Sequence, residues 1–259
     1  MENRPTLPLL HAPPEADWSK NSLGTIVQPK WRTTEKVNKV NTLFTAIRNV
    51  QRAVPLAQCS SMKIGGPAKY FVQVSTSEEL ERAVRAAIDL KIPYVVLGGS
   101  SNVLISDTGF DGLVIRNISN EIQFDRSTVT VSSGYNFSRL AVLAAEHGLT
   151  GLEFACGIPG TVGGAVFGNA GSFGSEMKDV LQSARVLRQD GTVVTMSTDE
   201  LQFGYRHSIL KERGGIVLAV VIVLQKGEGE AITKLQQKHL AYRREHQPLD
   251  WPSLGSVFK

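Results

Sequence analysis

The feature that most constrains the fold is a glycine-rich stretch from Gly151 to Glu176, "GLEFACGIPGTVGGAVFGNAGSFGSE". It holds eight glycines among apolar residues and has almost no charge before its last residue. Glycine weakens regular structure, so such a density marks backbone that turns sharply or approaches something closely. The stretch therefore predicts a loop whose backbone can pass close to a flat or anionic ligand.

A second glycine segment, "VLGGSSNVLIS", covers residues 96–106 and follows a predicted buried strand. Gly98 and Gly99 allow a tight turn, and the next three residues offer hydroxyl, amide and backbone N–H donors that suit a phosphate or pyrophosphate. The residues after this loop resemble a strand. Neither segment fits a P-loop or the Rossmann fingerprint, because G-x-x-x-x-G-K-[ST] is absent and no G-x-G-x-x-G opens a helix. The simpler alternative, that both segments are only structural turns, stays open here.

The rest of the chain mixes strand and helix patterns without strict alternation, which favours an α+β fold. Thr76 and Glu79 have capping-box spacing, and Asn136 and Gly148 suit the N-cap and C′ positions of a helix. Asp190-Gly191 predicts a hairpin turn. Helices are expected at residues 41–50, 76–91, 136–148 and 229–247, and strands at residues 68–74, 93–99, 112–117, 121–124, 128–134, 183–198 (as a hairpin) and 214–225.

Composition excludes several classes of protein. With 42% hydrophobic and 20% charged residues, the chain has an ordinary globular composition, and no apolar run reaches the roughly 18–20 residues that span a bilayer. The net charge is +4 and no basic stripe with interleaved aromatics is present, which argues against nucleic-acid binding. Two cysteines exclude a disulfide framework and a cysteine metal site. We expect no membrane insertion, no metal, a cytoplasmic location and a monomer.

Five segments, taken together in order and spacing, resemble the UDP-N-acetylenolpyruvoylglucosamine reductase (MurB) family over roughly residues 56–259. They are "SMKIGGPAKYFVQV", "VLGGSSNVLISDTGFDGLVI", the glycine-rich stretch, "FGYRHSIL" and "YRREHQPLDWPSLGSVFK". The resemblance implies an FAD-binding fold of the vanillyl-alcohol oxidase (PCMH) type with two subdomains, followed by the beginning of a substrate-binding domain. It also implies NADPH as hydride donor and a UDP-sugar enolpyruvyl substrate, in peptidoglycan synthesis.

On this basis we expect four regions. They are a poorly ordered extension at 1–40, FAD-binding subdomains at 41–155 and 156–228, and the start of a truncated substrate-binding domain at 229–259. The expected truncation follows because the family's catalytic glutamate would lie beyond the last residue, and the chain alone could then be inactive.

The resemblance also assigns roles to individual residues. Arg206 would hold the substrate carboxylate, Ser256 would donate a proton, and Tyr205 and Phe173 would lie near the substrate. The cofactor would be held by Gly98, Gly99, Ser100, Ser101, Asn102, Val103, Leu104, Ile158, Pro159, Gly160, Val162, Gly163, Gly164, Asn169, Ala170, Gly171 and Arg243.

Two departures from the family pattern stand out. Ser100 occupies a position where many relatives have a third glycine, and Phe173 one where some have a tyrosine. Outside the motif, Arg206 would be read as a surface arginine and Ser256 as a turn serine. A non-catalytic FAD-binding fragment and a different flavin oxidoreductase of the same fold remain as alternative functions.

Overall fold

The computed structural model describes residues 41–255, so the predicted extension at 1–40 lies outside the described residues. A four-stranded sheet has the order β1-β2-β4-β3, and a five-stranded sheet has the order β11-β10-β12-β6-β5. The first consists of β1 (Gln51–Pro55), β2 (Pro67–Val74), β3 (Tyr94–Leu97) and β4 (Phe110–Asn117). The second consists of β5 (Ile122–Asp125), β6 (Thr128–Ser132), β10 (Leu181–Leu187), β11 (Val193–Ser197) and β12 (Ile216–Val223).

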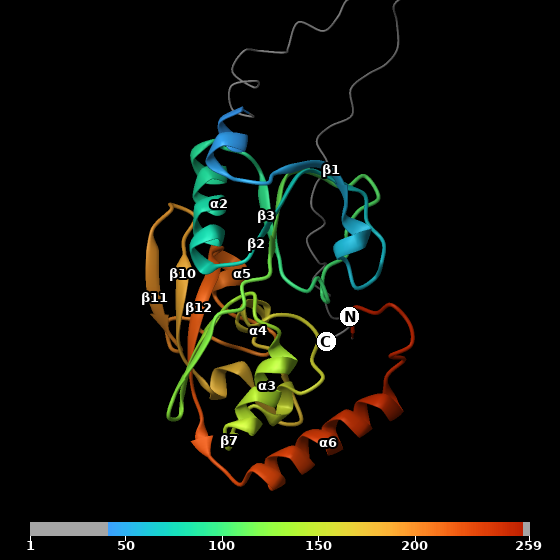
Figure 1. Cartoon of the computed structure of the whole chain (residues 1–259), viewed down its shortest axis with the longest axis vertical. Coiled ribbons are helices and arrows are strands. Elements are labelled where there is room, and N and C mark those ends of the chain that lie inside the picture. Colours follow the sequence, from blue (N-terminus) through green and yellow to red (C-terminus); the bar gives the residue numbers. More distant parts are fainter. Residues whose placement is uncertain (1–40, 256–259) are drawn as a thin grey trace, which may run out of the picture.

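Helices and short pairings complete the fold (Figure 1). Besides a short helix at residues 41–46, the α-helices are α2 (Ser77–Asp89), α3 (Phe137–Glu146), α4 (Val162–Gly168), α5 (Leu210–Arg213) and α6 (Gly229–His246). The 3-10 helices are η1 (Leu56–Cys59), η2 (Glu153–Ala155) and η3 (Met177–Asp179). Two small sheets pair β7 (Leu149–Thr150) with β13 (Gln225–Lys226), and β8 (Gly171–Ser172) with β9 (Ser175–Glu176).

The first sheet buries both of its faces. Successive strand residues point to opposite faces, so Val72 and Ile115 pack with α2 in one cluster, whereas Phe71 and Val114 pack in another. The α2 cluster also includes Leu218 of β12. The helix therefore joins the first sheet to the second.

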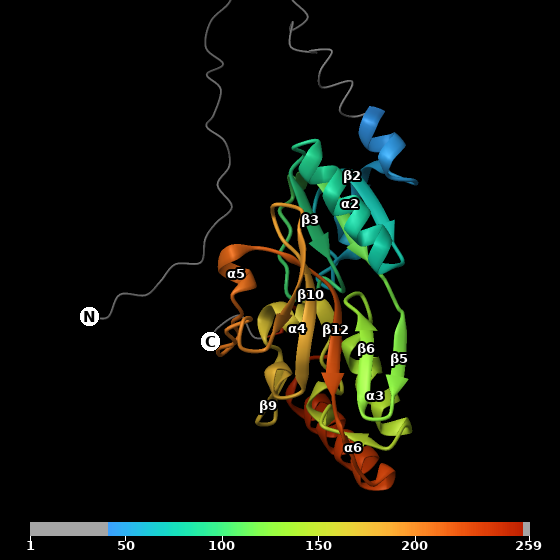
Figure 2. The same cartoon turned by 90° about the vertical axis from the view of Figure 1, so that its left-hand side faces the viewer.

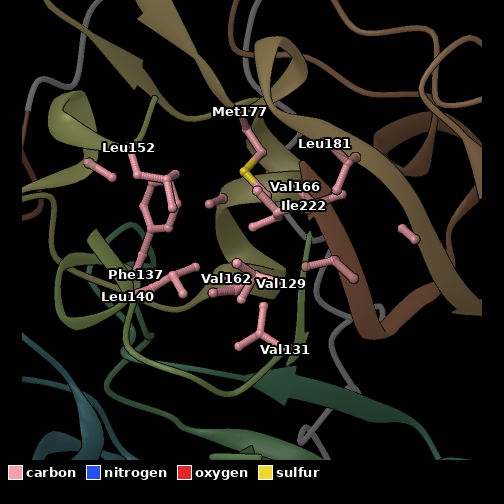
Figure 3. Close-up of a cluster of buried hydrophobic side chains, with 14 of the residues drawn as sticks. Val129, Val131, Phe137, Leu140, Leu152, Val162, Val166, Met177, Leu181 and Ile222 are labelled. Atoms are coloured by element: carbon pink, nitrogen blue, oxygen red, sulfur yellow. The ribbon is translucent and has the colours of Figure 1, made fainter. Parts of the chain in front are cut away.

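The second sheet packs against α3 and α4 (Figure 3), and β12 is central between β10 and β6. The core between sheet and helices includes Phe137, Val162, Val166 and Ile222. Helix α6 lies across the end of the molecule farthest from α2 (Figure 2). Its Gln236 donates to the carbonyl oxygen of Ala141 at 2.8 Å, which fixes α6 to α3.

Several local predictions are confirmed. The Thr76 hydroxyl accepts from Glu79 N at 3.1 Å, and the Asn136 side chain accepts from Arg139 N at 2.8 Å. Gly148 follows the C-cap of α3 at φ 67°, and Gly191 has φ 82° in the hairpin turn. The helix expected at 41–50 covers residues 41–46. The apolar run near residue 220 is a largely buried strand, as expected.

Two predictions differ from the structure. The "PYVVL" strand is not fully buried, because β3 lies at the sheet edge and only Leu97 is buried. The glycine-rich stretch is not loop throughout, because residues 162–168 form α4.

The change from one sheet to the other falls between Asn117 and Ile122, whereas the expected subdomain boundary lies at residues 155–156. The reason is that β6 pairs with β12, far along the chain. The division into cofactor-binding subdomains itself stays a prediction.

No helix within residues 41–255 is both long and apolar enough to cross a membrane. The same part of the chain has no group of three or more His, Cys, Asp or Glu side chains that could hold a metal ion.

Candidate functional site

The two glycine segments meet at the start of α4. A Cβ on Gly98 would come within 2.4 Å of the Thr161 hydroxyl oxygen, and one on Gly99 within 3.0 Å of Gly160 Cα. Ser101 Oγ donates to the carbonyl oxygen of Pro159 at 3.0 Å. A Cβ at 98 would overlap the Thr161 side chain, and one at 99 would press against the Gly160 backbone, so glycine at both positions lets the two segments lie this close. The structure thus brings together residues that are 58 apart in sequence.

A third segment, residues 133–137 after β6, completes this junction. Gly163 N donates to Ser133 O at 2.8 Å, and a Cβ on Gly163 would lie 2.8 Å from Ser133 Cβ. Ser133 Oγ accepts from Asn117 Nδ2 at 2.8 Å. Sequence reasoning missed Ser133 and Asn117, although "SSG" directly after a strand is a turn signal that could have pointed to this segment.

Ser100 is the most unusual residue of the junction. Its backbone has φ 50°, in the left-handed region, and the residue is 5% exposed. Its Oγ is buried without a hydrogen-bond partner in the described part of the chain. Both features cost free energy, so the loop is shaped for something other than its own stability. A hydroxyl in this position can donate to a phosphate oxygen.

The other end of α4 holds Arg206. Its Nη2 donates to the carbonyl oxygen of Gly171 at 2.7 Å, and its backbone has φ 53°. Asn169, fully buried, caps the end of α4 and donates to Gly204 O at 2.9 Å. The turn that carries Arg206 is therefore tied to the residues that follow α4.

The carboxylate of Glu176 lies near Arg206 and is held by two hydrogen bonds. Glu176 Oε2 accepts from Lys178 Nζ at 2.8 Å and from Asn169 Nδ2 at 3.1 Å. The Lys178 contact, with smaller contributions from Asn169 and the charge of Arg206, lowers the pKa of Glu176 below its usual 4.5. Within residues 41–255, the Arg206 guanidinium makes one hydrogen bond, to Gly171, so further N–H groups can donate to a ligand.

The first glycine segment and Arg206 lie at opposite ends of helix α4. With seven residues it is about 10 Å long. Thr161 at its start adjoins the first glycine segment, and Gly171 just beyond its end adjoins Arg206. A long ligand lying along α4 can therefore contact both.

Arg243 and Phe173 form the neighbouring part of the site, where α6 crosses β8. Arg243 Nη2 donates to Ser172 Oγ at 2.7 Å and its Nε to Cys156 O at 3.2 Å, and burial lowers the pKa of its guanidinium. Phe173 stacks on His239 with ring centres 3.8 Å apart. A pocket of ≈ 580 Å³ opens here, lined by Ser172, Phe173, Lys238, His239, Tyr242, Arg243 and Gln247.

The other predicted site residues differ in how far they are buried. Val162 is fully buried in the core, so only its backbone can meet a ligand, and Ile158 and Ala170 pack against the same core. Asn102 and Leu104 are exposed, as is Tyr205. Val103 is exposed as well, and Gly164 N donates to the Thr161 hydroxyl at 3.4 Å. Ser256 lies outside the described residues.

Comparison with known proteins adds to this geometry. Residues 68–197 match the family model described as FAD binding domain. UDP-N-acetylenolpyruvoylglucosamine reductases of Streptococcus pneumoniae strains Hungary19A-6 and 70585 are each 45% identical over 207 residues, 79% of this chain and 68% of theirs.

Two solved structures are also similar to this chain. The crystal structure of UDP-N-acetylenolpyruvylglucosamine reductase (MurB) from Thermus caldophilus matches with a TM-score of 0.70 and 36% identity, covering 82% of this chain and 74% of that chain. Berberine bridge enzyme from Eschscholzia californica matches with a TM-score of 0.55 at 15% identity, over 74% of this chain and 44% of that one, which shows a shared fold only. The predicted fold, α+β of the FAD-binding type, is confirmed.

Proposed function

Because the chain belongs to the UDP-N-acetylenolpyruvoylglucosamine reductase family and contains an FAD-binding domain, we propose that it is an FAD-dependent reductase of UDP-N-acetylglucosamine enolpyruvate. The product is UDP-N-acetylmuramate, for peptidoglycan, and NADPH is the hydride donor. The proposed location is the cytoplasm and the proposed state is a monomer.

The observation that carries this proposal is the contact of residues 98–101 with residues 159–161. At this junction Gly98, Gly99 and Gly160 have no Cβ atom, and the buried Ser100 hydroxyl has no partner among the described residues. These features fit a pyrophosphate held by the first segment and a flat ring against the second. FAD, when bound there, supplies the two-electron chemistry that links nicotinamide oxidation to reduction of the substrate.

Arg206 is proposed to bind the substrate carboxylate. As the enolpyruvyl double bond is reduced, negative charge builds on the carbon beside that carboxylate. A guanidinium fixed in place stabilises this charge, because it stays protonated and matches a carboxylate with paired donors. The hydrogen bond to Gly171 and the strained backbone of Arg206 support such a fixed position.

Ser256 is proposed, from its sequence motif, to give a proton from Oγ to the same carbon. General acid help of this kind contributes typically about 10²–10⁴ in rate. Tyr205 and Phe173 are proposed to border the substrate, since Tyr205 is 64% exposed next to Arg206 and Phe173 lies in the α6 pocket.

The test is substrate-dependent oxidation of NADPH by the purified, FAD-loaded protein, with identification of the product. The proposal expects one UDP-N-acetylmuramate formed for each NADPH oxidised. FAD binding without any substrate-dependent oxidation would favour a non-catalytic flavoprotein instead, and oxidation that ignores the substrate would favour a different flavin oxidoreductase.

A further inference from the structure

Two buried polar side-chain atoms in residues 41–255 have no hydrogen-bond partner, Ser100 Oγ and Arg116 Nε. Both lie at the end of the first sheet where the parallel strands β3 and β4 have their carboxyl ends. Ser100 follows the end of β3, and Arg116 lies near the end of β4, paired in register with Leu97 of β3. Since β3 and β4 are parallel, their carboxyl ends lie side by side.

Arg116 has an unusually poor set of partners. Its Nη1 points to Cys59 Sγ at 3.7 Å, and a thiol sulfur is a weak acceptor. None of the ion pairs found in the described part of the chain includes it. A partly buried cation without a carboxylate is costly, so a guanidinium in this position is suited to an anionic ligand.

Two contacts place Arg116 next to the first glycine segment. Ser61, two residues after Cys59, donates from Oγ to Gly99 O at 3.2 Å. Leu97 and Ile105, at the two ends of the segment, pack in one cluster with Cys59. Both ends of the segment therefore lie close to Cys59, the residue that Arg116 contacts, and Ser61 holds its middle.

We propose that Arg116 binds the pyrophosphate of FAD. Residues 98–105, "GGSSNVLI", contain no cation, so they can offer N–H and O–H donors but no full charge to balance the diphosphate. A guanidinium supplies that charge together with paired donors. The inference rests on the proposed FAD site and adds a residue that the motif does not contain.

The UDP-sugar substrate also carries a diphosphate, so the two sources must be separated. We assign Arg116 to FAD, because it adjoins Gly99 through Cys59 and Ser61, whereas Arg206 lies beyond the opposite end of α4.

The experiment measures dissociation constants on protein stripped of flavin, with FAD and riboflavin followed by quenching of flavin fluorescence and UDP-N-acetylglucosamine by calorimetry. Arg116→Met should weaken FAD binding about 10- to 100-fold, the usual effect of losing a charge-assisted hydrogen bond. Riboflavin, which lacks phosphate, and the UDP-sugar should bind as to the parent protein. Arg116→Lys should fall in between.

The matched control is Arg82→Met, which removes the same charge from the exposed surface of α2 on the opposite face of the sheet. It should leave all three constants unchanged. Thermal unfolding of the flavin-free protein adds an independent readout. Arg116→Met should unfold at the same or a higher temperature, because it removes an unpaired, partly buried cation.

Each other result has a definite meaning. If the parent protein binds no FAD, the proposed function fails. If it binds FAD and Arg116→Met binds FAD equally well, only the present inference is overturned. Equal weakening of FAD and riboflavin, or a lower unfolding temperature of flavin-free Arg116→Met, would make Arg116 a structural residue. If Arg116→Met does not fold, Arg116→Lys decides, and unchanged FAD binding there overturns the inference.

Discussion

Arg206 and Gly171 are joined by a 2.7 Å hydrogen bond from Nη2 to the carbonyl oxygen, across 35 residues of sequence. Gly171 follows α4, the helix whose start contacts the first glycine segment. This bond therefore links the proposed carboxylate-binding residue to the proposed cofactor surface. It gives the arginine a fixed position rather than that of a mobile surface side chain.

The first prediction concerns Arg206. Arg206→Ala should lower kcat/KM by about 10²–10³, because it removes a positioned cation where charge develops. Arg206→Lys should recover part of the activity, since an ammonium keeps the charge but not the paired donors. FAD content should not change. Arg213→Ala, an exposed arginine of α5, is the control; unchanged turnover in Arg206→Ala would remove Arg206 from the mechanism.

The second prediction concerns the junction of the glycine segments. Gly98→Ala should destabilise the protein by about 1–3 kcal/mol, because its Cβ would overlap the Thr161 hydroxyl that caps α4. Gly168→Ala is the matched control, since a Cβ there meets nothing within 4 Å. It should remain within about 1 kcal/mol of the parent. Urea unfolding measures both, and equal stability of the two variants would show that the junction tolerates a side chain.

The third prediction separates strain from binding at Ser100. Ser100→Gly should stabilise the flavin-free protein by about 1 kcal/mol, because relief of the left-handed strain and loss of an unpartnered hydroxyl outweigh the added freedom of the unfolded chain. Ser100→Ala keeps the strain and removes the hydroxyl, so FAD should bind about tenfold more weakly. Chemical unfolding measures the stability of Ser100→Gly, and flavin titration measures FAD binding by Ser100→Ala. A Ser100→Gly variant less stable than the parent would contradict the predicted relief of strain.

These sites also show what the sequence could predict. Helices α2 and α3 have local signals, since Thr76 and Asn136 cap the residues that follow them in the chain. Helix α4 has a local N-cap in Thr161, but its segment "VGGAVFG" is rich in glycine, which disfavours helix. It forms through packing of Gly163 against Ser133, a contact between distant parts of the chain. Local patterns cannot express such a contact.

In the candidate site too, some features follow from local sequence and others from long-range contacts. Both glycine segments and Arg206 could be found from residue type and motif. That Asn169 ties the Arg206 turn to α4, and that Arg116 lies beside Cys59, depends on pairings over long sequence distances. Single-sequence reasoning had no signal for either contact.

The fourth prediction concerns pH. Contacts with Lys178 and Asn169 lower the pKa of Glu176 in the folded protein. Its charged form therefore stabilises the fold above the usual pKa of 4.5, and this contribution disappears as the pH falls through the lowered value. Glu176→Gln should be less stable than the parent near pH 6, and the difference should shrink toward pH 3. Urea unfolding across this range tests it, with Glu146→Gln on the surface of α3 as reference. A difference that does not depend on pH would contradict the assignment.

The central claim is that the two glycine segments form an FAD site, and the most direct measurement is the flavin content of the purified protein. Heat releases the ligand, which is then identified and quantified, before and after incubation with excess FAD. We predict one FAD for each chain. Absence of flavin even after added FAD, or occupancy by a flavin without the adenylate, would contradict the claim.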